Sequence, residues 1–88
     1  MSESLLKTDP KLAESIFEKA FYSAQKPRRK HKDHVFLVAS TIMGGEIKGE
    51  EWMDEVLKKF GWNEKITEEE KVMILNEAKR LIEEEKKC

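Results

Sequence analysis

The hydrophobic residues of this chain recur at the spacing of α-helices in four segments. Successive residues of a helix lie about 100° apart, so apolar residues spaced by three and four positions gather on one face. This spacing predicts helices over about residues 10–25, 34–43, 50–60 and 68–85. We therefore expect an all-α, compact four-helix domain, orthogonal or bundle-like, that spans residues 9–87 after an N-terminal extension of residues 1–8.

The first predicted helix has a clear start and a clear end. Asp9 can cap it ahead of Pro10, whose missing N–H costs nothing in a first turn. Pro27 disfavours helical geometry at Lys26, so the helix should end near Gln25. Tyr22 falls on its outer side. Its expected inner face consists of Leu12, Ala13, Ile16, Phe17, Ala20, Phe21 and Ala24.

The second predicted helix has Asp33 as a plausible cap and the pair Gly44 and Gly45 as its expected end. The bulky run 35–38 could equally be a buried strand, but ten residues between a cap and a glycine pair favour a helix. Leu37 is expected to point away from the inner face. The other large residues cover about half the circumference, which predicts a central helix that buries Val35, Phe36, Val38, Ala39, Ile42 and Met43.

The last two predicted helices also carry terminal signals. Gly61 should end the third helix, with Trp62 packing back against it, and Thr67 and Glu70 form the capping box of the fourth. The expected inner faces are Trp52, Met53, Val56 and Phe60 on the third helix and Ile74, Leu75, Ala78, Leu81 and Ile82 on the fourth. The loops at 46–48 and 65–67 could form a minimal two-stranded bridge, although isolated residues that plug the core are the preferred interpretation.

Composition restricts the class of protein. The 88 residues are 39% hydrophobic, which suffices for one small core. No apolar run approaches the roughly 18 residues of a membrane span, and the start of the chain does not resemble a signal peptide, so we expect a cytoplasmic protein.

The lone Cys88 cannot form an intramolecular disulfide. Abundant Glu and Lys are typical of proteins from very hot environments, and equally of small, highly charged helical proteins.

Positive charge is concentrated in one short segment, residues 26–32. It holds five of the chain's 17 basic residues, whereas the remainder carries 18 acidic side chains. Such asymmetry indicates an anionic partner, and the candidate residues that would bind it are Lys26, Arg28, Arg29, Lys30 and Lys32.

Two alternatives to phosphate binding stay open for this segment: a solvated loop paired with the protein's own acids, and a nuclear-import signal. Base-specific readout is not expected, because the segment has no interleaved aromatic residue and the third helix opens with acids. A helix-turn-helix is not expected either, since the predicted connection 44–49 is longer than usual.

The sequence offers no strong catalytic or metal-binding pattern. His31 and His34 flank Asp33 at a spacing that could hold a divalent ion, but the neighbouring cations disfavour it. We expect no metal, no cofactor and no enzymatic activity, since no catalytic spacing or phosphate-binding glycine loop occurs.

Apolar residues outside the predicted inner faces favour an interaction role. The candidates are Tyr22, Leu37 and Met73, and Leu5 and Leu6 precede the first helix. A small core benefits from a partner, and a twofold contact needs only one self-complementary patch. We therefore expect a non-catalytic macromolecular-interaction module that self-associates as a homodimer or binds another protein. Nonspecific binding of nucleic acid through residues 26–32 is the alternative; neither a membrane nor a small-molecule substrate is expected.

Overall fold

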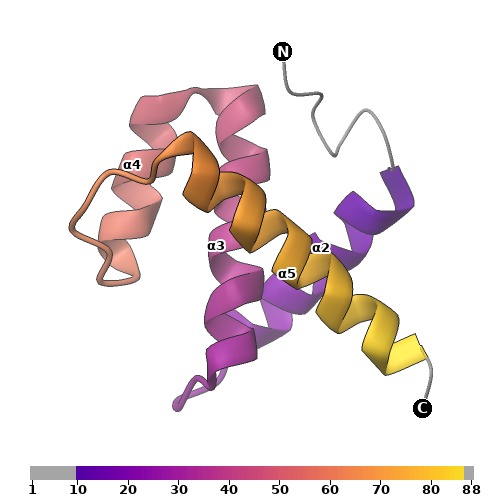
Figure 1. The fold of residues 1–88 in the computed structure, drawn as a ribbon. Coiled ribbons are helices and arrows are strands. Elements are labelled where there is room, and N and C mark those ends of the chain that lie inside the picture. The colour runs from indigo at the N-terminus through magenta and orange to yellow at the C-terminus, as the bar shows by residue number, and fades with distance from the viewer. Residues whose placement is uncertain (1–9, 87–88) are drawn as a thin grey trace.

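The computed structural model describes residues 10–86 and contains four α-helices in that range (Figure 1). Helix α2 spans Pro10–Ala24, α3 spans His31–Lys48, α4 spans Glu50–Lys59 and α5 spans Glu68–Lys86. No strand occurs within residues 10–86, so the predicted all-α four-helix domain is confirmed. The predictions made for residues 1–8, Asp9 and Cys88 lie outside the described residues.

Helix α3 lies at the centre of the fold and packs against each of the other three helices (Figure 1). Its side chains are buried on nearly every side, as predicted for a central helix. The expectation that Leu37 points away from the core is wrong, since only 3% of its surface is exposed. A helix with neighbours on several sides has no single inner face, so periodicity alone could not place Leu37.

The structure extends α3 at both ends beyond the predicted segment 34–43. The helix begins at His31, which makes Asp33 the third helical residue rather than the cap. The Oδ2 atom of Asp33 instead accepts a hydrogen bond of 3.0 Å from the backbone N–H of Lys30, the residue at the cap position. An acidic side chain that reaches back in this way satisfies one of the donors left unpaired at a helix start.

Gly44 and Gly45 lie inside α3, so their predicted role as its terminator is wrong. Their function is close packing between α3 and α4. A Cβ atom on Gly44 would lie 2.7 Å from two ring atoms of Trp52, and one on Gly45 would lie 2.9 Å from the Cβ of Met53. Glycine costs roughly 1 kcal/mol relative to alanine within a helix, and here the contact with α4 compensates for that cost.

A single residue, Gly49, separates α3 from α4. Its φ angle is 101°, a conformation that suits glycine, and its N–H donates to the carbonyl of Gly45 at 2.8 Å. The long connection predicted over residues 44–49 is therefore wrong, and so is the length argument against a helix-turn-helix. The acidic start of α4, with Glu50 and Glu51 exposed in its first turn, remains.

Gly61 terminates α4 as predicted: the last helical residue is Lys59, Phe60 is the cap and Gly61 follows it. The N–H of Trp62 donates to the carbonyl of Leu57 at 2.9 Å, and the N–H of Gly61 donates to that of Lys58 at 3.0 Å. These two bonds, with a φ of 90° at Gly61, form a Schellman motif. Trp62 packs back on the cluster that contains Leu57, which is itself buried and was missing from the predicted inner face.

The predicted capping box of α5 is confirmed. The N–H of Glu70 donates to the Thr67 hydroxyl at 3.2 Å, and the N–H of Thr67 donates to the Glu70 carboxylate at 3.3 Å. The predicted apolar stripe of this helix faces inward, with Ala78 and Ile82 buried.

The core consists of two clusters that share α3 and α5. The larger joins α2, α3 and α5, and the smaller joins α3, α4 and Ile66 from the loop before α5. Ile66 therefore plugs the core, as the preferred interpretation of that loop expected. The possible two-stranded bridge is wrong: residues 46–48 form the last turn of α3, where Ile47 is 71% exposed.

Candidate interaction surface

The basic segment begins as a short loop and ends inside a helix. Because α3 starts at His31, Lys32 lies in its first turn, while Lys26, Arg28, Arg29 and Lys30 lie between α2 and α3. All five basic side chains belong to exposed residues. The ion pairs and hydrogen bonds that these five side chains form within the chain show which of their charges remain available to a partner.

Lys26 is paired with a buried carboxylate of this chain. Asp33 is 2% exposed, and its Oδ1 atom accepts hydrogen bonds from the Ser23 hydroxyl at 2.9 Å and from the Lys26 ammonium at 3.3 Å. The pKa of Asp33 is lowered, chiefly by the backbone N–H of Lys30, with Ser23 and Lys26 adding to the effect against the opposing influence of burial. This cluster fixes the loop between α2 and α3.

Lys32 and Arg29 also have partners within the molecule. Lys32 lies 3.9 Å from a carboxylate oxygen of Glu85 on α5. Arg29 donates to the carbonyl of Ala24 at 3.3 Å, and its guanidinium lies 5.9 Å from the centre of the Phe60 ring. Of the five predicted anion-binding residues, only Arg28 and Lys30 have side chains without an ion pair or hydrogen bond to another residue of the range 10–86.

The buried face of α2 differs from the predicted one. Its inward residues are Ala13, Ile16, Ala20 and Ser23, three of which have small side chains. Small side chains allow two helices to approach closely, and Ser23 meets Asp33 across this contact. The predicted inner face spans about 180° of the helix, which is more than a few neighbours can cover. The spacing of the small residues was the signal that could have corrected it.

Because α2 turns its small residues towards the core, three of its aromatic residues lie at the surface. They form an aromatic patch that consists of Phe17, Phe21 and Tyr22. These residues are 36%, 65% and 60% exposed. The rings of Phe21 and Tyr22 meet edge to face, with centroids 6.1 Å apart and an interplanar angle of 77°. The expectation that Phe17, Phe21 and Ala24 face the core is wrong, whereas the outward position of Tyr22 is confirmed.

The three interface candidates therefore have different environments. Tyr22 belongs to the aromatic patch, and Met73 lies on α5, where it is 68% exposed beside a half-exposed Val72. Leu37 is buried in the larger core cluster and cannot contact a partner of the folded chain.

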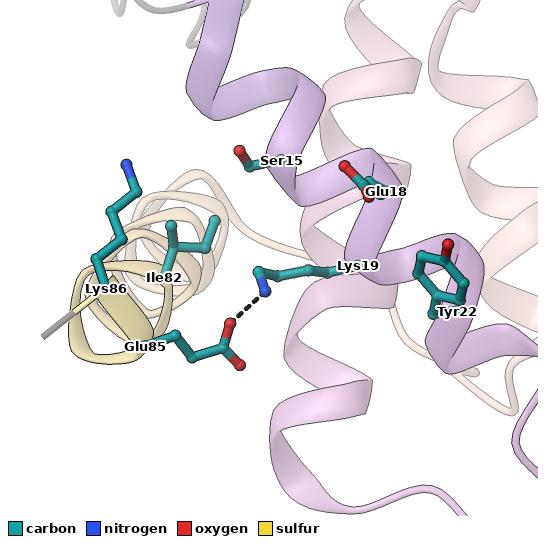
Figure 2. Close-up of a pocket in the computed structure, with 7 residues that line it drawn as sticks. All are labelled: Ser15, Glu18, Lys19, Tyr22, Ile82, Glu85 and Lys86. Carbon is teal, nitrogen blue, oxygen red and sulfur yellow. Dashed lines mark hydrogen bonds and ion pairs between the residues drawn. The ribbon is translucent and has the colours of Figure 1, made fainter. Parts of the chain in front are cut away.

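A groove of about 360 Å³ runs between α2 and α5 (Figure 2). An ion pair between Lys19 and Glu85 crosses it, and Tyr22 forms part of its wall. The hydrogen bond from Lys19 lowers the pKa of Glu85. Lys19 and Glu85 neutralise each other, and the other two charged lining residues, Glu18 and Lys86, are exposed and of opposite sign, so the formal charges of the lining sum to zero.

His31 and His34 do not assemble a metal site with their neighbours. His31 and His34 are exposed, while Asp33 between them is buried. The carboxylate of Asp33 already accepts hydrogen bonds from Ser23, Lys26 and the backbone of Lys30. Within residues 10–86, no three His, Cys, Asp or Glu side chains come together as possible metal ligands.

No model of a known protein family, no curated protein and no solved structure matches this chain significantly. In the part of the chain that the structure describes, no helix combines the length and the apolar character needed to cross a membrane. The surface chemistry of the described residues is therefore the basis for a functional assignment.

Proposed function

We propose that this protein is a non-catalytic helical interaction module that self-associates through the aromatic patch of α2. The observation that carries the proposal is the exposure of Phe17, Phe21 and Tyr22 on one helix of a small domain. Aromatic side chains are enriched at the centres of protein interfaces, where a few of them contribute most of the binding energy.

A second copy of the chain is the occupant that this patch favours. In a twofold contact the same residues appear on both sides, so one ring cluster supplies the apolar surface of both partners. The exposed large apolar residues elsewhere are Ile47 on α3 and the neighbouring Val72 and Met73 on α5, none of which is aromatic; scattered residues of this kind are found on most protein surfaces. The patch is the larger and more aromatic surface.

Sedimentation analysis over a range of concentrations tests the proposal. Wild type should approach the mass of a dimer as the concentration rises, and Phe17→Ser with Phe21→Ser should remain a monomer. Ile47→Ser is the matched control, because Ile47 is as exposed as Phe21 but lies on α3, and it should still dimerise.

Two results would reject this assignment. A wild type that stays monomeric throughout removes self-association. A dimer that is lost in Met73→Ser but kept in the phenylalanine variant would place the contact on α5 instead of α2.

Phosphate-backbone binding through the basic segment is the second candidate function. It is favoured by Arg28 and Lys30, whose exposed side chains have no ion pair within residues 10–86. It is weakened because Lys26, Arg29 and Lys32 already contact groups of this chain. A pair of available cations gives a small gain from counterion release.

Fluorescence anisotropy with a labelled oligonucleotide at low salt tests this second candidate. Binding should weaken when Arg28 and Lys30 become Ser and should be retained when Lys58 and Lys59, two exposed cations on α4, are changed in the same way. Absence of binding at low salt, or equal loss in both variants, would contradict it.

A further inference from the structure

Charged residues of opposite sign precede and follow Phe21 along the chain. Glu14 and Glu18 are exposed on the N-terminal side of Phe21, and Arg28 and Lys30 are exposed on its C-terminal side. None of these four charged residues forms an ion pair with another residue of the segment 10–86. Two acids and two bases that are close to the patch in sequence are thus available to a partner copy.

The two acids share a face with the rings. At about 100° per residue, Glu14, Phe17, Glu18 and Phe21 fall within roughly 100° of one another around α2. A helix that lies over the rings therefore also approaches both carboxylates. The basic residues follow the end of α2 at Ala24, after a turn in which Lys26 N–H still donates to the carbonyl of Ser23 at 3.2 Å.

Given the self-association proposed above, on which this step rests, we infer that the two copies pair their α2 helices antiparallel about a twofold axis beside Phe21. In such a pair, a residue of α2 before Phe21 in one copy lies opposite the residue as many positions after Phe21 in the other, as far as α2 extends, so the N-terminal part of each α2 lies beside the C-terminal end of its partner's. Glu14 and Glu18 precede Phe21 on α2, and Arg28 and Lys30 belong to the segment that follows the end of α2 at Ala24. The acids of each copy therefore face the basic segment of its partner.

The same register suits the apolar contacts. Phe21 meets its own symmetry mate at the axis, and Phe17 of one copy lies over residues 24–25 of the other. Ala24 is exposed and small, so it leaves space for that ring. A parallel arrangement would instead place acid beside acid and base beside base, which is repulsive. Charge complementarity thus selects the antiparallel orientation.

Two charge-reversed variants test the orientation. The acid-reversed variant carries Glu14→Lys and Glu18→Lys, and the base-reversed variant carries Arg28→Glu and Lys30→Glu. In a homodimer of either variant, the contacts at both ends of the α2 pair become repulsive. At low ionic strength, each should dimerise at least about tenfold more weakly than wild type, because each reversed contact is duplicated by symmetry.

The informative measurement is an equimolar mixture of the two variants. In the mixed dimer, the Glu14→Lys and Glu18→Lys side chains lie towards the end of the helix pair that carries Arg28→Glu and Lys30→Glu of the other copy, while the unchanged Arg28 and Lys30 lie towards the end that carries the unchanged Glu14 and Glu18. Every contact is attractive again, so the mixture should dimerise within about threefold of wild type. Circular dichroism of each variant checks that its helices are intact.

A matched control uses charges remote from α2. Reversal of Glu50 and Glu51 in one variant and of Lys58 and Lys59 in the other changes the same numbers of exposed charges on α4. Neither these variants nor their mixture should alter dimerisation. An equal effect in this pair would assign the results to net charge and overturn the inferred orientation.

The outcomes separate this inference from the function on which it rests. A monomeric wild type overturns both, including the case in which residues 1–9 of the same chain occupy the patch. A wild-type dimer that depends on Phe17 and Phe21 but is not restored by mixing overturns the antiparallel register alone. Restoration in the mixture supports both.

Discussion

The hydroxyl of Ser23 donates a hydrogen bond of 2.9 Å to Oδ1 of Asp33, which joins the last turn of α2 to the first turn of α3. Both side chains are buried, at 3% and 2% exposure. Asp33 also accepts from Lys26 and from the backbone of Lys30, so a single carboxylate connects both ends of the loop. The course of the basic segment depends on this interaction.

Replacing Asp33 by Asn should destabilise the fold by about 1–3 kcal/mol. The amide retains the shape of the carboxylate, but it loses the charge that pairs with Lys26 and presents one acceptor oxygen instead of two. Urea unfolding followed by circular dichroism measures the effect. Glu64→Gln, in the exposed loop after α4, is the control and should stay within about 0.5 kcal/mol of wild type.

The stability of wild type should fall in acid partly through Asp33. Its pKa in the folded protein is below the ordinary value of 3.8, so protons bind more tightly to the unfolded chain. The stabilising contribution is complete above the unfolded pKa and is lost as pH falls through the folded pKa. The difference in unfolding free energy between wild type and Asp33→Asn should therefore shrink from pH 7 towards pH 2. A constant difference would contradict the assignment.

Gly44→Ala should destabilise the protein by about 1–3 kcal/mol, although alanine is the better helix former. The added Cβ would lie 2.7 Å from the ring of Trp52, so α3 and α4 would have to separate. Thermal unfolding of the single and double variants tests this cause. With Trp52→Ala already present, the ring is absent and the same substitution should stabilise the helix, by up to about 1 kcal/mol.

Gly61→Ala should cost about 1–2 kcal/mol for a different reason. No atom lies within 4 Å of a Cβ built on Gly61, so the cost comes only from the φ angle of 90°. Asparagine adopts positive φ more readily, and Gly61→Asn should therefore destabilise less than Gly61→Ala in chemical denaturation. Equal losses in the two variants would indicate a steric cause instead.

The terminal signals of the helices could be read from the sequence because they act over a few neighbouring residues. Thr67 and Glu70 satisfy each other's backbone donors, and Gly61 supplies the left-handed residue that ends α4. Pro27 likewise prevents α2 from continuing into the basic segment. Each interaction is complete within one turn, so it does not depend on the rest of the fold.

The role of Gly44 and Gly45 was decided by tertiary packing. As an isolated pattern, a glycine pair after an apolar run indicates a helix end. The approach of Trp52 and Met53 makes the same residues the contact surface of a continuous helix. The energy of that contact depends on residues that lie a turn or more away on another helix, which local propensity does not include.

The sequence by itself determined that residues 10–86 form four helices with one central member, since helical periodicity and caps are local properties. Only the tertiary structure decided which side of α2 meets α3, and thereby that Phe17 and Phe21 lie at the surface while Leu37 is buried. The physical reason is that close approach requires small side chains, here Ala13, Ala20 and Ser23, whatever the hydrophobicity of their neighbours. Likewise, the count of positive charges was evident from the sequence, but their pairing with Asp33 and Glu85 depends on how α2, α3 and α5 meet.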